Sequence, residues 1–328
     1  MSGAAARRLL ARAVGFRAVD ARSLAAARVA WGSWENLYAA LAREKLTPLL
    51  GWRAERESFP GDRAFKDRLR VLARETLAGN LWRRQTYEKV SAALAGAGIP
   101  AWPLKGVDLA FTLYPSPACR PFTDVDVLVA PDNYRAAQDV LRAEGFEELK
   151  REPRWWPGRS FSRRGQLVDL HGSPAATLPR RGITWPPEFP ESGEGVTDEF
   201  RLLTAISHLQ NHFFALPTLY YFEAALLAAR VSWESYWPLA RRWNAARATK
   251  FVLEIAADFL GEPARGYGFF GLQAAARLSL EGGDPGRGAR AAFIYALSLD
   301  NPAAALVSGL RRPGWAKEVL TRTPEAST

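Results

Sequence analysis

The sequence is poor in the residues that form disulfides and zinc sites. It has one cysteine, Cys119, in 328 residues, and three histidines. A single cysteine excludes an intramolecular disulfide and is typical of a protein in a reducing compartment. No zinc-binding pattern, internal repeat or Walker-type phosphate loop is present. We therefore expect a cytoplasmic protein that is long enough to bury a sizeable hydrophobic core.

Long apolar runs are also missing. The stretch 202–222 has no charged residue, but His208, His212 and Pro217 interrupt it. A membrane-spanning helix needs about 20 predominantly apolar residues. The first residues are basic but lack an apolar core, so we expect neither a signal peptide nor a membrane span.

Acidic residues are the minority among the charged ones. The chain has 34 Asp and Glu against 44 Lys and Arg, which gives a net charge of +10. A basic surface favours polyanions such as nucleotides, nucleic acid or acidic membranes. An Ala- and Arg-rich composition explains the same excess without any ligand, and both explanations stay open at this point.

The clearest pattern in the chain begins near residue 98. The apolar run Ile99–Leu104 predicts a buried strand. Lys105 and Gly106 end that strand, and Val107–Tyr114 fits a short helix closed by prolines. The sequence therefore predicts a strand, a glycine-containing turn and a short helix in that order.

A second predicted strand, Thr123–Ala130, carries two carboxylates. Successive side chains of a strand point to opposite faces, so Asp124 and Asp126 share one face and the valines between and after them share the other. Neighbouring carboxylates repel each other unless a cation lies between them, and oxygen ligands suit Mg²⁺ or Mn²⁺. The alternative is a pair of solvated carboxylates on an edge strand, which the buried run after Asp126 disfavours.

A hairpin is predicted further along, with arms Gly158–Arg163 and Gln166–His171 and a turn between them. In its second arm Asp169 and His171 share a face. Asp169 joins the two earlier carboxylates if this arm lies beside their strand. Otherwise it is a surface carboxylate on a hairpin.

The order Lys-Gly, short helix, Tyr-Pro and Arg-Pro-x-x-Asp-x-Asp resembles the uncharacterised nucleotidyltransferase family of the polymerase-beta-like superfamily. The resemblance covers residues 96–172 well. It implies that a glycine-containing turn faces the triphosphate of an NTP, and that the Asp-x-Asp pair and a third carboxylate hold Mg²⁺ or Mn²⁺. It thus implies catalytic and metal-binding roles for Asp124, Asp126 and Asp169.

The resemblance also implies that Lys105, Gly106 and Arg120 bind the nucleotide. The chain departs from the superfamily by placing Lys before Gly and Val107 where a serine normally follows. Gly106 lacks a Cβ, so its backbone can approach a phosphate at the start of a helix. Lys105 adds a point charge to that site or is simply solvated. Arg120 either pairs with an aspartate or forks onto phosphate oxygens.

We expect an α+β fold in three parts: an N-terminal helical region (1–97), a nucleotidyltransferase palm built on a small mixed sheet (98–172), and a connector with a C-terminal helical region (173–328). Nothing before residue 96 suggests chemistry. The expected reaction moves an NMP from an NTP to an acceptor hydroxyl of a small molecule, a protein or an RNA end. The alternatives are a catalytically silent nucleotide-sensing module and a basic nucleic-acid-binding protein.

Three further features have two interpretations each. His171 is either a neighbour of the metal ligands or a structural histidine. His208 and His212 lie one helical turn apart without a third ligand at suitable spacing. The segment Arg151–Arg164 mixes arginines with tryptophans, as nucleic-acid surfaces do, and also fits an amphipathic hairpin that shields the sheet.

Overall fold

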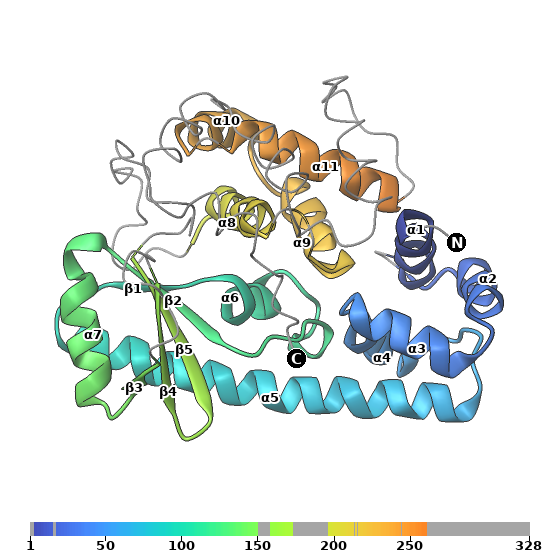
Figure 1. The fold of residues 1–328 in the computed structure, drawn as a ribbon, viewed down its shortest axis with the longest axis horizontal. Helices are drawn as coiled ribbons and strands as arrows, with labels where there is room; N and C mark the ends of the chain where they lie inside the picture. Colours follow the sequence, from blue (N-terminus) through green and yellow to red (C-terminus); the bar gives the residue numbers. More distant parts are fainter. Residues whose placement is uncertain are drawn as a thin grey trace, which may run out of the picture. The chain divides into compact units, whose positions relative to one another are not determined.

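The computed structural model describes residues 3–260 apart from 16–17, 150–157, 173–195, 213, 215 and 244. The described chain is α+β, as expected, and contains helices and a five-stranded mixed sheet (Figure 1). The α-helices are α1 (Gly3–Val14), α2 (Ala21–Trp31), α3 (Trp34–Arg43), α4 (Thr47–Ala54), α5 (Arg63–Gly96), α6 (Lys105–Thr112), α7 (Tyr134–Ala143), α8 (Asp198–Asn211), α9 (Thr218–Ala228), α10 (Trp233–Arg242) and α11 (Ala246–Leu260). The strands are β1 (Ala101–Pro103), β2 (Val125–Val129), β3 (Glu147–Glu148), β4 (Gly158–Arg163) and β5 (Gln166–His171), and two 3₁₀ helices are η1 (Pro117–Cys119) and η2 (Pro131–Asn133).

The chain divides into two compact units. One comprises Met1–Leu46, Arg56–Phe65 and Ala205–Thr328, and in it α1 packs on α2 and α11, while α11 packs on α9. The other comprises Thr47–Glu55 and Lys66–Thr204 and contains the whole sheet. Every residue predicted to bind metal or nucleotide lies in this second unit. The three-part division of the sequence stays a prediction.

The sheet has the strand order β1-β2-β5-β4-β3. β2 and β5 are parallel, and the other neighbouring pairs are antiparallel. The predicted hairpin is confirmed as β4 and β5, joined by Arg164 and Gly165, which both have positive φ (50° and 79°). Two positive φ values are typical of the type I′ turn that matches the twist of the flanking strands.

One face of the sheet is covered by helices. The core on that face contains residues of α5, α6 and α7 together with the inward-facing side chains of the strands (Tyr87, Val90, Leu94, Val107, Ala110, Val125, Val127, Val129, Ala137, Leu141, Phe161, Val168 and Leu170). On β2 and β5 these apolar residues alternate with the carboxylates, so the carboxylates lie on the opposite face. A smaller cluster of Trp102, Leu104, Leu128, Val196 and Phe200 packs on that opposite face.

The uncharged stretch 202–222 belongs to two helices, α8 and α9, with a break before Pro217. Phe200 donates its backbone N–H to Thr197 Oγ1 at 3.2 Å, so Thr197 caps the start of α8. In the described part of the chain, no helix combines the length and the apolar character that crossing a membrane requires.

Candidate functional site

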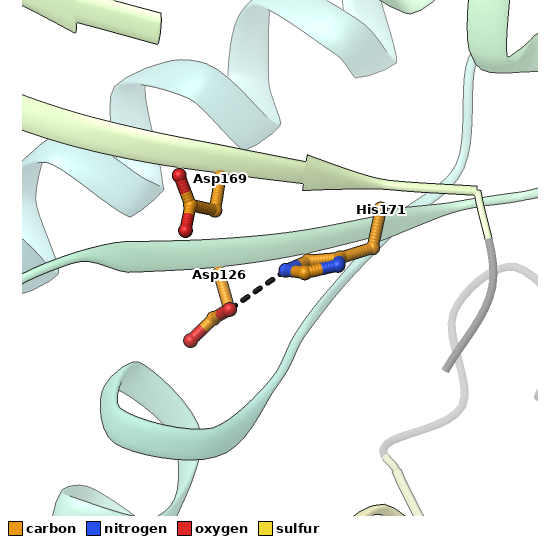
Figure 2. A group of neighbouring side chains, drawn as sticks. All are labelled: Asp126, Asp169 and His171. Carbon is orange, nitrogen blue, oxygen red and sulfur yellow. Dashed lines mark hydrogen bonds and ion pairs between the residues drawn. The ribbon is translucent and has the colours of Figure 1, made fainter. Parts of the chain in front are cut away.

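Asp126 and Asp169 are brought together by the central strands of the sheet. β2 and β5 run parallel with Asp126 directly opposite Asp169, and Leu128 opposite His171. Because side chains alternate along a strand, the two aspartates and His171 all emerge on the same face (Figure 2). One ligand atom from each of the three residues lies within 4.8 Å of the others. The prediction that Asp169 joins the Asp-x-Asp strand is therefore confirmed for Asp126.

Asp126 is held by two hydrogen bonds to a single oxygen. It is 2% exposed, and its Oδ1 accepts a hydrogen bond from Lys105 Nζ at 2.6 Å. His171 Nε2 lies 2.7 Å from the same oxygen, as the dashed line in Figure 2 shows. Burial opposes ionisation of Asp126, but the charge of Lys105 and the hydrogen bond from His171 outweigh it and lower the pKa to about 2.

An ionised carboxylate only accepts hydrogen bonds, so His171 donates its Nε2–H to Asp126. In this arrangement His171 orients Asp126. This contact fits both interpretations of His171, as a neighbour of the metal ligands and as a hydrogen-bonded structural histidine.

Asp169 has an oxygen without a partner. Its Oδ1 is buried and makes no hydrogen bond to any described residue. A buried carboxylate oxygen is costly unless a hydrogen-bond donor or a cation satisfies it. The residue that carries this oxygen lies directly opposite the ionised Asp126, and oxygen ligands of this kind fit Mg²⁺ or Mn²⁺. The residues present therefore fit a divalent cation.

Asp124 lies just outside this group. The strand was expected to begin at Thr123, but β2 begins at Val125, where pairing with Val168 of β5 starts. The pKa of Asp124 is raised to about 6, first by burial and then by the negative charges of Asp126 and Asp169. Asp124 is thus close enough to repel both, but among the described residues only Asp126, Asp169 and His171 form a cluster with metal-binding spacing.

Lys105 begins α6 in an unusual backbone conformation. Its φ is 49°, in the left-handed region that a lysine rarely adopts. The conformation places the ammonium group on Asp126, and the surrounding carboxylates, Asp126 above all, outweigh burial and raise the pKa of Lys105 to about 12. The helix begins two residues before the expected Val107, so Lys105 and Gly106 form its first residues, and the lysine is the one with left-handed backbone.

Gly106 is required by packing inside the protein. A Cβ at this position would lie 2.5 Å from both Cβ and Cγ of Phe122 and 2.7 Å from Nη1 of Arg120. The sequence suggested that the missing Cβ serves phosphate approach, and the structure adds this second reason for glycine. Arg120 itself is 3% exposed, and its guanidinium lies beside Gly106.

Helix α5 contributes two polar residues that the sequence analysis missed. Asn80 is fully buried, and its Nδ2 donates to the carbonyl oxygens of Pro117 and Arg120, both at 2.7 Å. Arg83 lies one turn later, with its Cζ 5.7 Å from the centre of the Phe122 ring. The sequence does contain one sign of this: Asn80 stands at a position of α5 where the helical spacing predicts an apolar residue.

Asp108 was also missed. Its two carboxylate oxygens accept from Nε and Nη2 of Arg201 at 2.7 and 3.0 Å. Arg201 also donates to Asp198 at 2.9 Å. This forked ion pair fastens the beginning of α8 to α6, the helix that carries Lys105 and Gly106.

The remaining sequence predictions have mixed outcomes. Arg154 and the tryptophans of the segment Arg151–Arg164 lie outside the described residues. Arg159 contacts Glu148 at 3.3 Å and Arg163 contacts Glu144 at 4.0 Å, and both interpretations of this segment stay predictions. The rings of His208 and His212 lie 4.7 Å apart, but neither belongs to a metal-binding cluster of the described residues.

Comparison with known proteins gives one finding. The sequence model of an uncharacterised nucleotidyltransferase family matches residues 32–261, which is more than half of the chain. No curated protein and no solved structure gives a significant match. The matched segment includes all the residues of the candidate site.

Proposed function

The chain belongs to this family of uncharacterised nucleotidyltransferases, and from that premise we propose that it moves a nucleoside monophosphate from an NTP to an acceptor hydroxyl and releases pyrophosphate. The observation that carries the proposal is the unpartnered Oδ1 of Asp169 beside the ionised carboxylate of Asp126. A structural carboxylate pair would have its oxygens satisfied by protein donors.

Asp124, Asp126 and Asp169 would hold Mg²⁺ or Mn²⁺. When bound, such ions activate an attacking hydroxyl and neutralise the charge of the leaving pyrophosphate. The protein supplies rigidity: the parallel pairing of β2 with β5 fixes the distance between Asp126 and Asp169, and His171 fixes the orientation of Asp126. Positioned groups of this kind carry most of the catalysis in phosphoryl transfer.

Residues of the chain would accept the proton of the acceptor hydroxyl and bind the negative charge of the phosphates. The acceptor oxygen forms a bond to the α-phosphorus, the bond from that phosphorus to the pyrophosphate oxygen breaks, and the Asp169 carboxylate takes the proton of the acceptor hydroxyl. The backbone N–H groups at the start of α6, with Lys105 and Arg120, would bind the negative phosphates. A small molecule, a protein side chain or an RNA end can each supply the acceptor hydroxyl.

A catalytically silent nucleotide-sensing module is the second candidate. The observation that favours it is the ammonium of Lys105, which lies 2.6 Å from Asp126 Oδ1 and already gives that carboxylate a cation. In a silent module this ion pair would persist when nucleotide binds. In the enzyme, Lys105 would release Asp126 and turn to a phosphate.

The test is incubation of the protein with each α-labelled NTP, Mg²⁺ and cell extract, followed by tracking of the label. We expect label transfer by the wild type and its loss in Asp169→Asn, which should still bind MgNTP. The exposed Asp139→Asn is the matched control and should transfer label normally. Nucleotide binding without transfer in the wild type would leave the silent module as the better account.

A further inference from the structure

We infer that Arg83 of α5 is a phosphate-binding residue whose guanidinium takes the triphosphate of the nucleotide bound beside Asp126 and Asp169. The inference rests on the proposed function for the identity of the ligand as a nucleotide. It brings a helix to which the sequence analysis assigned no chemistry into the binding site.

The position of Arg83 is fixed by its neighbours. Its Cζ lies 5.7 Å from the centre of the Phe122 ring, and Phe122 in turn fills the space at Gly106, where α6 begins. Arg83 and the start of α6 thus contact the same side chain. Asp124, two residues after Phe122, is close enough to interact electrostatically with Arg83. The guanidinium therefore contacts the ring that packs on the turn expected to face phosphates, and its charge interacts with one carboxylate expected to hold metal.

Arg83 differs from three other arginines of α5 in having no ion-pair partner among the described residues. Arg70, Arg74 and Arg84 form ion pairs with Asp67, Glu55 and Glu88 at 2.8, 3.1 and 3.0 Å. Within the part of the chain that the structure describes, the guanidinium of Arg83 makes no hydrogen bond and no ion pair. It is partly buried, and burial lowers its pKa because desolvation penalises the charged form. A partly desolvated guanidinium without an acceptor is suited to bind an anion.

The helix itself is adapted to this arginine. A Cβ at Gly79 would lie 2.7 Å from Arg83 Nη1, so glycine leaves room for the guanidinium to lie against α5. Glycine within a helix is unfavourable by roughly 0.5–1 kcal/mol relative to alanine, so its presence here needs a local reason. The two hydrogen bonds from Asn80 then hold the loop that leads to Phe122 against the same stretch of helix. Gly79 thus lets the guanidinium lie close to the helix, and Asn80 holds the loop that leads to the ring Arg83 contacts.

A counter-ion for Asp124 is the competing explanation. A guanidinium that serves only to neutralise a carboxylate is expected to pair with it directly, as Arg70, Arg74 and Arg84 do. Arg83 and Asp124 make no such pair, although their charges interact. A triphosphate carries several negative charges, so Arg83 can bind it in addition to Lys105, whose ammonium contacts Asp126 in this structure. Arg83 is thus a fork-shaped donor available beside this site.

The experiment compares the wild type with Arg83→Gln by isothermal titration. The probes are Mn²⁺ alone, the preformed complex of Mn²⁺ with inorganic tripolyphosphate, and the MnNTP complex. We expect Arg83→Gln to weaken both triphosphate probes at least tenfold and to bind Mn²⁺ alone as tightly as the wild type or more tightly, because a positive charge near the carboxylates has been removed. Arg84→Gln is the matched control from the same helix and should leave all three affinities unchanged.

Several outcomes overturn the inference. Unchanged tripolyphosphate affinity in Arg83→Gln would overturn it. If that variant also binds Mn²⁺ more tightly, Arg83 is a counter-ion of the carboxylates. A wild type that binds no tripolyphosphate complex would overturn it as well.

Near-normal unfolding of Arg83→Gln, followed by circular dichroism, establishes that the affinities belong to a folded protein. If it unfolds, Arg83→Lys is titrated instead, and it should weaken tripolyphosphate binding several-fold because an ammonium cannot fork; unchanged binding in that variant also rejects the inference. Absence of label transfer by a wild type that binds tripolyphosphate through Arg83 would reject the proposed function and leave the inference intact.

Discussion

Asp126 and Asp169 face each other at the same register position of two parallel strands, and one oxygen of Asp169 is buried without a partner. Asp126, by contrast, accepts from both Lys105 and His171 at a single carboxylate oxygen. The pair is therefore unequal. Asp126 is fixed and ionised, whereas Asp169 keeps an oxygen available for a ligand or a proton.

The ion pair between Lys105 and Asp126 should make the stability of the metal-free protein sensitive to Asp126→Asn. The substitution leaves the ammonium of Lys105, 23% exposed, without its carboxylate. We expect the free energy of unfolding in urea to fall by about 2–3 kcal/mol, below the full penalty of a completely buried pair. The double variant with Lys105→Met should recover most of this loss, and no recovery would show that the ion pair is not its cause.

The pKa of Asp124 predicts a pH dependence in the metal-free protein. The folded value is about 6 against an ordinary value of 3.8, so between these pH values the folded state binds more protons than the unfolded state. The contribution of Asp124 to stability therefore decreases as pH rises from about 4 to 6. Asp126, with a pKa of about 2, stays ionised throughout this window.

Thermal unfolding of the wild type and Asp124→Asn at pH 4.5 and 7.5, in EDTA, checks this. The variant should gain stability relative to the wild type at the higher pH. Mn²⁺ should raise the wild-type Tm more at pH 7.5 than at pH 4.5, because cation binding requires the ionised carboxylate. A Tm difference between the two proteins that is independent of pH would contradict the assignment.

Gly106→Ala should destabilise the fold even without nucleotide. The new Cβ would meet Phe122 at 2.5 Å and the Arg120 guanidinium at 2.7 Å. Overpacking of this kind typically reduces the free energy of unfolding by about 1–3 kcal/mol. Gly96→Ala is the matched control, because nothing lies within 4 Å of its Cβ position. Equal stability of Gly106→Ala and the wild type in urea would mean that this glycine serves the ligand alone.

The forked pair of Asp108 with Arg201 should stabilise the unit that contains the sheet. The side chains of Asp108 and Arg201 are 4% and 17% exposed, so Asp108→Asn leaves a largely buried guanidinium without its main acceptor. We expect a loss of about 3 kcal/mol in urea unfolding. Asp198→Asn removes a more exposed contact of the same arginine and should cost less than about 1 kcal/mol. Similar losses in the two variants would show that burial does not distinguish these contacts.

Much of the fold could be predicted from the sequence because the relevant signals are local. The period-two pattern around Asp126 and the Arg164-Gly165 turn depend on neighbouring residues, so the strands and the hairpin were found within a few positions. Among the described residues, helices are present before residue 97 and after residue 197, where the sequence analysis expects helical regions. The identity and order of Lys105, Gly106, Arg120, Asp124 and Asp126 also sufficed for the family resemblance that the match over residues 32–261 confirms.

The arrangement of the site was decided by tertiary structure. Alternation places Asp169 on one face of its strand, but only the parallel pairing of β5 with β2 sets it opposite Asp126. Local pattern also does not reveal that Lys105 reaches Asp126, that Phe122 fills the space beside Gly106, or that Asn80 and Arg83 approach from a distant helix. These contacts join segments far apart in the chain, and their geometry depends on how helices and strands pack, which no short stretch of sequence encodes by itself.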